Sequence, residues 1–368
     1  ERELRLLKEF YGGEIRYLAF LDDTFTASEE RLLELCDVVD RVFPDKSRFS
    51  FCCEARVDVL ARRPSLIERM RRAGLVGMQV GLESGNQEFL DAMNKHTSCE
   101  DIESVIIHCE EYDIPFVAGN FIFGLPYQNR DDIEREIEYA KRLTCLAPKR
   151  LELTVKALMP YPGSEYGDHP EKWGLTIIDE DFASGRIHSE SFLKNSSLAR
   201  EDIEDSCRRF RAIVGDFALR QAAPLLSPRE YKALVVLTAE TSQPSFVLSR
   251  LSCFTHIARL VLLRRRYDHR FLYEIEEGLW RECAPVAIPE NITSRCEDGY
   301  VVNRGSPFEF LLKPQDMKYY RCFVGKLTFG EIAARVAMEE GTDVNQALED
   351  CLSVYQECED SLAAVALL

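Results

Sequence analysis

The most constraining feature of this sequence is a regular alternation of short apolar runs and amphipathic stretches over residues 1–160. The apolar runs have the length of buried strands, and the stretches between them repeat apolar residues at helical spacing. Strands that alternate with helices form βα units on a parallel sheet, because each parallel connection needs a crossover segment. We therefore predict an α/β fold whose sheet closes into an incomplete barrel.

The expected elements follow one another in the order strand, helix, strand. The predicted strands are residues 15–21, 49–53, 76–82, 116–123 and 150–158. The predicted helices are residues 29–42, 65–73, 87–94, 99–112 and 131–143. Five strands in about 150 residues fit the length of a βαβ unit, which is roughly 30 residues.

Polar residues follow every predicted strand. In a parallel α/β fold the carboxyl ends of the strands meet at one rim, where ligands bind. Carboxylates there can pair with an amine, arginine with a carboxylate, and short polar groups with hydroxyls. For Ser84 and Asn86 the alternative is that they only cap the next helix. The strand-end residues are Asp22, Asp23, Glu54, Arg56, Asp58, Glu83, Ser84, Asn120 and Ser164.

Charge and cysteine usage exclude several classes of protein. The net charge of −17 argues against nonspecific binding to nucleic acid or to an anionic membrane, because both require a basic surface. The length of 368 residues predicts two or three domains. The thirteen cysteines are scattered, and no secretory segment or membrane-spanning run is present. We therefore predict a cytoplasmic protein with reduced thiols.

Six short stretches stand in a fixed order within residues 1–164. They are Phe20–Thr26, Glu54–Asp58, Ala73–Leu75, Gly81–Gly85 with Asn94 and Lys95, Phe121–Pro126 and Pro160–Ser164. Together they resemble the radical S-adenosylmethionine (SAM) superfamily, specifically the MiaB-like core of cobalamin-binding radical SAM proteins. The resemblance implies an enzyme, built on a partial (β/α)6 barrel that lacks its first strand.

The resemblance also implies which residues bind SAM. Asp22 and Asp23 stand where such enzymes hold the methionyl amine of SAM. Glu83 and Ser84 stand where they contact its ribose or its amino acid portion. Arg56 is a candidate for binding the SAM carboxylate or the substrate.

The fourth predicted strand resembles the one that lies against adenine, and its candidate residues are Asn120, Ile122 and Gly124. Two features depart from the family pattern. Residues 12–14 spell the Gly-Gly-Glu triplet that binds the SAM amine in many relatives, but they precede the first strand, so we expect no SAM contact there. Gln128 stands where the family commonly has glutamate, which removes a charge.

The family's reductive chemistry needs a [4Fe-4S] cluster held by a Cys-x3-Cys-x2-Cys motif, and no such spacing occurs in this sequence. We expect the cluster cysteines upstream of Glu1, and the chain without them to be inactive. The predicted cofactors are accordingly SAM and a [4Fe-4S] cluster with ligands outside this chain. The resemblance to cobalamin-binding members of the superfamily adds cobalamin as a further candidate. A reductant protein is the implied electron donor.

The rest of the chain gives weaker signals. We divide the chain into residues 1–164, 165–290 and 291–368, where the middle range is an extended and helical region that covers the barrel. The helices predicted in this range are residues 200–225, 228–239, 246–264 and 271–282. The last range contains a hairpin at residues 300–305 and 308–312, followed by helices, the first of these capped by Thr328. This order is similar to the PqqD-like winged-helix fold and implies binding of a precursor peptide. A structural role remains the alternative.

These features predict a radical SAM enzyme that cleaves SAM to a 5′-deoxyadenosyl radical and modifies a peptide or small molecule. Cobalamin-dependent methylation is the modification that the resemblance suggests. Two alternatives remain open. One is a methylthiotransferase or an enzyme like coproporphyrinogen oxidase, which would share the core. The other is a non-catalytic binding protein that keeps the SAM pocket but lacks the cluster.

Overall fold

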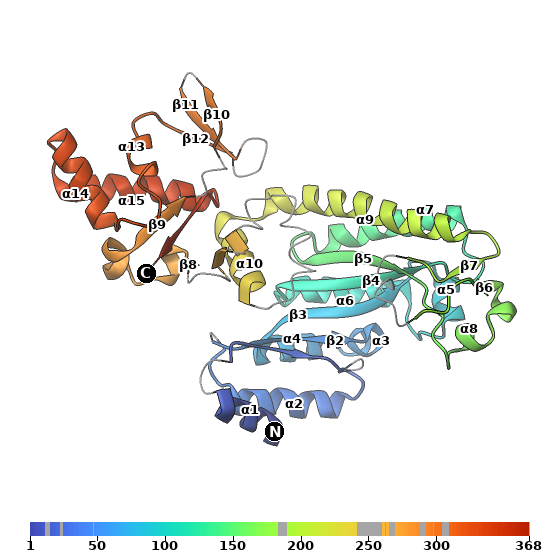
Figure 1. Cartoon of the computed structure of the whole chain (residues 1–368). Coiled ribbons are helices and arrows are strands. Elements are labelled where there is room, and N and C mark those ends of the chain that lie inside the picture. Colours follow the sequence, from blue (N-terminus) through green and yellow to red (C-terminus); the bar gives the residue numbers. More distant parts are fainter. Residues whose placement is uncertain are drawn as a thin grey trace. The chain divides into compact units, whose positions relative to one another are not determined.

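The protein consists of two compact units, Glu1–Ala222 and Ala223–Leu368, which are described separately (Figure 1). The computed structural model describes residues 1–11, 15–22, 25–46, 48–182, 190–240, 260–261, 263–264, 269–287, 292–296, 298–303 and 309–367. Residues 165–222 pack with the first unit and residues 223–290 belong to the second. The division into three domain ranges stays a prediction. Among the described residues, no helix has the length and apolar character needed to span a bilayer.

The first unit is built on a five-stranded sheet of order β1-β2-β3-β4-β5, in which every neighbouring pair is parallel. The predicted α/β fold with a parallel sheet is therefore confirmed. Each strand overlaps a predicted one. The strands are β1 (Tyr17–Phe20), β2 (Ser50–Ala55), β3 (Leu75–Glu83), β4 (Phe116–Phe123) and β5 (Leu151–Ala157).

The connecting helices begin and end at local signals in the sequence. Side chains of Ser28, Ser98 and Asn129 accept hydrogen bonds from the free backbone N–H groups at the starts of α2, α6 and α7. Gly74 ends α4 in the left-handed conformation, with φ of 110°. The short helix α3 was not predicted. The helices are α1 (Arg2–Tyr11), α2 (Glu29–Val42), α3 (Val57–Arg62), α4 (Ser65–Ala73), α5 (Gln87–Ala92), α6 (Cys99–Glu111) and α7 (Arg130–Leu146).

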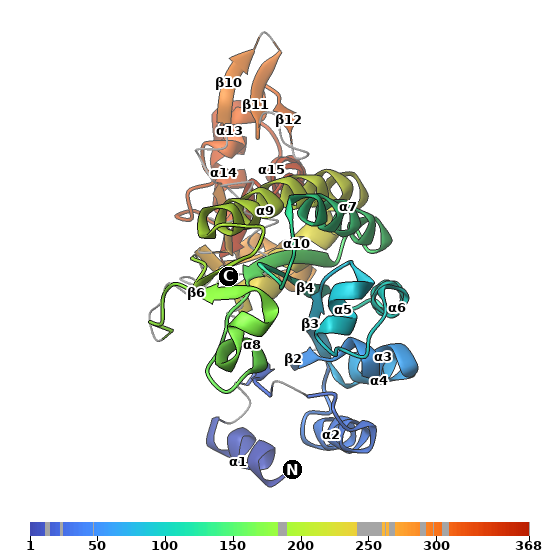
Figure 2. The same ribbon diagram turned by 90° about the vertical axis from the view of Figure 1, so that its right-hand side faces the viewer.

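The two faces of this sheet have different surroundings. Along β2 buried and half-buried residues alternate, and the same alternation runs through most of β3 and β5. Figure 2 shows α2, α4, α6 and α7 along one side of the sheet, and the buried set faces these helices. Because successive side chains of a strand point to opposite faces, the half-buried set lines the other face.

The helix α9 (Arg200–Ala222) completes the helical layer of the first unit. Phe210 packs against Phe121 and Phe123 of β4, with ring centroids 5.2 Å and 5.4 Å apart. Before α9 the chain forms α8 (Glu165–Asp168), a 3-10 helix (Pro170–Trp173), and an antiparallel pair of strands, β6 (Leu175–Ile177) and β7 (Leu193–Asn195).

The second unit combines two small antiparallel sheets with helices. One sheet has the order β10-β11-β12 and the other β8-β13-β9. The predicted hairpin corresponds to β11 and β12, whereas β10 was not predicted. The strands are β8 (His269–Arg270), β9 (Ala284–Ala287), β10 (Ile292–Cys296), β11 (Gly299–Val302), β12 (Phe310–Leu312) and β13 (Ala364–Leu367).

The helices of the second unit are α10 (Pro228–Glu240), α13 (Met317–Tyr320), α14 (Phe329–Glu340) and α15 (Val344–Asp360). Thr328 caps α14 as predicted, and Glu331 bonds back to the Thr328 N–H in a capping box. A helix predicted over residues 271–282 is wrong, because two 3-10 helices (Leu272–Glu274 and Glu277–Glu282) stand there instead. Most of the helix predicted over residues 246–264 lies outside the described residues.

Candidate functional site

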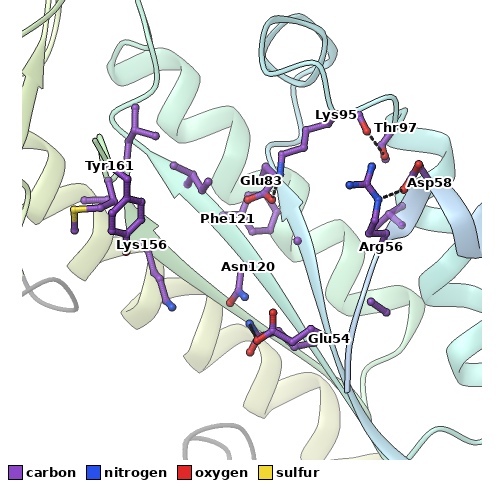
Figure 3. Close-up of a pocket in the computed structure, with 18 residues that line it drawn as sticks. Glu54, Arg56, Asp58, Glu83, Lys95, Thr97, Asn120, Phe121, Lys156 and Tyr161 are labelled. Carbon is purple, nitrogen blue, oxygen red and sulfur yellow. Dashed lines mark hydrogen bonds and ion pairs between the residues drawn. The ribbon is translucent and has the colours of Figure 1, made fainter. Parts of the chain in front are cut away.

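A cavity of about 590 Å³ opens over the carboxyl ends of the strands in the first unit (Figure 3). Its volume lies within the range of small-molecule sites, which is roughly 300–1,000 Å³. The end residues of β2, β3, β4 and β5 contribute to its wall, together with the segments that follow them. The lining residues are Glu54, Ala55, Arg56, Val57, Asp58, Gln79, Gly81, Glu83, Lys95, Thr97, Asn120, Phe121, Ile122, Lys156, Ala157, Leu158, Met159 and Tyr161.

Glu83 holds a central place in this cavity. Its backbone is left-handed, with φ of 65°, which is a strained conformation for a residue with a side chain. Its Oε1 atom lies 2.6 Å from Nζ of Lys95, and the Glu83 side chain is only 12% exposed. Gly81 leaves room for the carboxylate, because a Cβ atom at that position would lie 2.5 Å from Oε1 of Glu83. The end of β3 and the segment after α5 thus place an acid and a base side by side.

Ser84 lies behind this strand end, outside the cavity. Its buried hydroxyl donates a hydrogen bond to the carboxylate of Glu136 on α7. The N–H of Gly85 donates to the other oxygen of Glu136 at 2.6 Å. Burial raises the pKa of Glu136 to about 7, because removal from water disfavours the charged form. Glu136 therefore anchors the turn that follows Glu83, and the predicted SAM contact of Ser84 stays untested.

Of the two acids predicted to bind the SAM amine, the structure describes Asp22, and it does not bring this residue to the cavity. Asp22 pairs with Arg31 at 3.3 Å, and both side chains are more than one-third exposed. Asp22 does not line the cavity. Asp23 lies outside the described residues, as do residues 12–14. The predicted contact between this strand end and the SAM amine therefore remains a prediction.

Arg56 does line the cavity, but its charge is matched by a neighbour. Its Nε atom donates to Asp58 at 2.9 Å, and this hydrogen bond raises the pKa of Arg56. Asp58 also pairs with Arg62 at 2.9 Å. The N–H of Arg56 donates to the hydroxyl of Thr26 at 2.9 Å, which fixes the chain where it leaves β2. Arg56 is thus held at the rim.

The three candidates on β4 and its exit are divided between two places. Asn120 and Ile122 line the cavity, as the resemblance predicts for the adenine strand. Gly124 does not, and it has a left-handed φ of 83° in the turn after β4. The N–H of Gly124 donates to Oε1 of the buried Gln128 at 2.8 Å. Gln128 accordingly holds the turn, and it too lies outside the cavity.

Sequence reasoning missed Gln79 and Lys156, both of which line the cavity. Gln79 and Lys156 are polar residues inside otherwise apolar runs, and their position in the period-2 alternation of a strand could have identified them. Lys95 was noted only as part of the family pattern. Tyr161, which follows β5 and also lines the cavity, was likewise noted only within the stretch Pro160–Ser164 of that pattern.

The cysteines of the described residues do not fit a [4Fe-4S] cluster. Within the part of the chain that the structure describes, no three His, Cys, Asp or Glu side chains gather in a way that could hold a metal ion. Cys52, on the open face of β2, accepts a hydrogen bond from the hydroxyl of Tyr17 at 2.7 Å. Burial raises the pKa of the Cys53 thiol, which disfavours the thiolate that binds iron.

Residues 1–140 match the radical SAM superfamily, the family that the six sequence stretches resemble. This part of the chain is therefore similar to a radical SAM domain, and the activity of the whole protein stays a proposal. The superfamily assignment implies SAM and a [4Fe-4S] cluster as cofactors of the class.

Relatives of known name resemble only part of this chain. An uncharacterised methyltransferase of Pyrococcus horikoshii is 25% identical over 167 residues, which are 45% of this chain and 34% of the relative. An anaerobic magnesium-protoporphyrin IX monomethyl ester cyclase of Cereibacter sphaeroides is 28% identical over 127 residues, which are 34% of this chain and 20% of the relative. The matched part thus spans about a third or less of these relatives.

Among solved structures, the cobalamin-dependent SAM radical enzyme OxsB with aqua-cobalamin bound is similar to this chain. The two are 12% identical, with a TM-score of 0.43, and the likeness covers 98% of this chain and 53% of the OxsB chain.

Proposed function

We propose that this protein is a radical SAM enzyme that binds SAM in the cavity at the end of the sheet. The observation that carries the proposal is the Glu83–Lys95 pair, which lies inside the radical SAM domain at a strained strand end. Strained residues cluster at functional sites, where the surrounding structure holds them in place. SAM would supply the 5′-deoxyadenosyl radical, and the cavity would hold SAM in position.

The chemistry of SAM is complementary to the cavity. SAM carries an ammonium, a carboxylate, two ribose hydroxyls and a flat apolar base. The carboxylate of Glu83 can accept hydrogen bonds from the ammonium or the hydroxyls, and Lys95 can pair with the SAM carboxylate. Ile122 and Ala157 add apolar surface to the same cavity, which suits the base. These residues bind and orient SAM, and the cavity wall limits its access to water.

We also propose that a Cys-x3-Cys-x2-Cys motif holds the cluster, and residues 1–368 contain no such motif. Methylation with the help of cobalamin is the proposed reaction class, because one relative is named as a methyltransferase. Ring closure is the competing class, because another is named as a cyclase. A methylthiotransferase remains a further alternative. The electron that cleaves SAM would come from a reductant protein.

A second proposal concerns the second unit, which we propose binds a precursor peptide. Among the described residues, β12 pairs with β11 alone, so its outer edge is open to a further strand. Leu311 on β12 is 42% exposed. An extended peptide can add to such an edge through its main-chain groups. A peptide that protects the β12 amides from hydrogen exchange would support this, and unchanged exchange in its presence would contradict it.

The enzyme proposal is tested by the formation of 5′-deoxyadenosine from SAM. The full-length protein is reconstituted with iron and sulfide without oxygen, and is then supplied with a reductant. We expect Glu83→Gln to lower the rate at least tenfold, whereas Glu88→Gln leaves it within twofold. Glu88 is an exposed residue of α5 outside the cavity, so it makes a matched control. A protein that carries the cluster but cleaves no SAM would contradict the proposal.

A further inference from the structure

A buried carboxylate anchors the turn that lies between the two partners of the Glu83–Lys95 pair. Glu136 is on α7 and is only 2% exposed. One of its oxygens accepts a hydrogen bond from the Ser84 hydroxyl, and the other accepts one from the Gly85 N–H at 2.6 Å. Glu136 does not line the cavity, so any effect that it has on a ligand there must pass through the turn.

Two further contacts hold the same turn against the helices. The Cys99 thiol, at the start of α6, donates to the Gly85 carbonyl at 3.3 Å. A Cβ atom on Gly85 would lie 2.2 Å from the ring of Tyr139, so the backbone rests directly on α7 and only glycine fits there. Both backbone polar groups of Gly85 are thus bound, and the turn has little freedom to shift.

The hydrogen bonds continue from Ser84 toward Lys95. The Asn86 N–H donates to the Ser84 hydroxyl at 3.0 Å, and the Asn86 side chain caps the start of α5. Lys95 follows α5, and its backbone N–H donates to the Leu90 carbonyl of that helix at 3.2 Å. A connected set of hydrogen bonds therefore runs from Glu136 to the segment that carries Lys95.

Glu83 joins the other end of this turn. Its left-handed backbone, with φ of 65°, directly precedes Ser84, and such a conformation persists only where the surrounding structure holds it. Without the two acceptors of Glu136, a buried hydroxyl and a backbone N–H would be left unpaired. The turn would then relax to satisfy them, and the Glu83 carboxylate would change its direction relative to Lys95.

We propose that Glu136 is a positioning residue of the SAM site, which sets the SAM affinity by holding the Ser84–Gly85 turn and, through it, the Glu83 carboxylate. This proposal rests on the proposed function, because Glu83 is the residue assigned to SAM. Glu136 touches neither SAM nor substrate. The geometry of the site thus depends on α7, a helix that contributes no residue to the cavity wall.

The first test asks whether Glu136 acts through Glu83. SAM binding to the reconstituted full-length protein is measured by calorimetry for Glu136→Met, which removes both acceptors, with and without Glu83→Gln. We expect Glu136→Met alone to weaken SAM about tenfold, which is the factor that loss of one hydrogen bond produces. In the Glu83→Gln background the same substitution should weaken it less than about twofold, because the two residues act as one unit. Equal factors in both backgrounds, or no loss from Glu136→Met alone, would overturn the proposal.

Two further variants separate the hydrogen bonds from other effects. Glu136→Gln keeps a carbonyl for the Gly85 N–H and offers an N–H to the Ser84 oxygen, so it should restore SAM affinity to within about threefold. Glu138→Met is the matched control on the same helix, because the Glu138 side chain is 71% exposed and pairs with Lys141. It should change SAM affinity by less than about twofold. Binding as weak as that of Glu136→Met in either variant would contradict the proposal.

A second measurement needs no SAM. Hydrogen exchange of the backbone amides is followed by NMR in the unliganded protein. In Glu136→Met we expect the Gly85 amide to exchange at least about tenfold faster, because it has lost its acceptor, while exchange in α2 stays unchanged. Unchanged exchange at Gly85, or faster exchange throughout α2 as well, would overturn the proposal. If Gly85 responds as expected but the unaltered protein binds no SAM, the proposed function fails and the hold of Glu136 on the turn remains.

Discussion

The protein contains two sets of charged residues that differ in how completely they are satisfied. In the second unit Lys232 and Glu359 are buried, and their charged atoms lie 2.8 Å apart. Lys232 also pairs with Asp360 at 2.6 Å. Glu359 accepts further hydrogen bonds from the Leu272 N–H and the Tyr355 hydroxyl. The buried ammonium of Lys232 thus makes two hydrogen bonds inside the protein, and the buried carboxylate of Glu359 accepts three.

The cavity of the first unit is arranged differently. Glu54, Asn120 and Lys156 have bonding capacity that no described residue takes up, and the Glu83 backbone is strained. A satisfied buried cluster stabilises one conformation, because loss of any member leaves an unpaired charge. Unsatisfied groups in a cavity contribute little to folding and are available to a ligand. We therefore expect substitutions in the buried cluster to destabilise the protein. Substitutions in the cavity should weaken ligand binding and leave the stability nearly unchanged.

The largest expected effect is on the stability of the second unit. Lys232→Met leaves Glu359 buried without its cation, which costs about 3–5 kcal/mol. Unfolding by urea reports this loss through the fluorescence of Trp280 in a Trp173→Phe background, since the two tryptophans lie in different units. Lys194→Met serves as the control, because Lys194 is exposed on β7 of the first unit, and should leave the free energy of unfolding that Trp280 reports unchanged. A loss below 1 kcal/mol for Lys232→Met would show that the cluster is not a stabilising element.

The next effect is a pH dependence of the first unit. The pKa of Glu136 is raised to about 7 in the folded state from an ordinary value of 4.5, so the folded state binds the proton more tightly. Its contribution to stability is fully present below about pH 4.5 and is lost as the pH rises to about 7. At about 1.4 kcal/mol per pKa unit the loss is roughly 3 kcal/mol.

Glu136→Gln removes the titrating group from this site. The difference in the free energy of unfolding between the two proteins should therefore change between pH 4.5 and 7.5. Trp173 reports the unfolding of the first unit in a Trp280→Phe background. Parallel pH profiles for the two proteins would rule out the raised pKa of Glu136.

A smaller effect is expected for the shape of the SAM site. Gly81→Ala places a Cβ atom where only 2.5 Å separates it from the Glu83 carboxylate, so the carboxylate must move. We expect about tenfold weaker SAM binding, equal to about 1.4 kcal/mol, measured by calorimetry. Gly215→Ala on α9 is the control, because a Cβ atom there meets no other atom. Equal SAM affinity in the two variants would show that Gly81 does not shape the SAM site.

The smallest effect is expected for Lys156. Because its ammonium has no partner among the described residues, Lys156→Met should change the free energy of unfolding by less than about 0.5 kcal/mol. The Trp173 transition in urea measures it. A loss comparable to that of Lys232→Met would mean that Lys156 has a structural partner, which would remove the contrast between the two regions.

Much of the fold of the first unit follows from local sequence signals. The helices 29–42 and 65–73 were predicted with the ends that the structure has, where Ser28 caps the first helix and Gly74 ends the second. The helix α3 was missed because it has only six residues and its capping residue, Arg56, makes no side-chain cap. Short helices depend on tertiary packing, which periodicity does not report.

The site could be predicted only in part. Arg56, Glu83, Asn120 and Ile122 line the cavity as strand-end residues should. Ser84 turned inward to Glu136, fifty-two residues away, and no local pattern predicts such a long-range hydrogen bond. Gln79 and Lys156 were missed for a similar reason. They are brought to one cavity only by the strand register, which is a property of the folded sheet.

The most direct test of this account is the affinity of SAM for Glu83→Gln and Glu88→Gln, measured by calorimetry without oxygen on the full-length protein. Both substitutions remove one negative charge within six residues of each other, but only Glu83 lines the cavity. The account predicts that Glu83→Gln weakens SAM binding at least tenfold and that Glu88→Gln changes it less than twofold. Equal affinities for the two variants would contradict the assignment of the cavity as the SAM site.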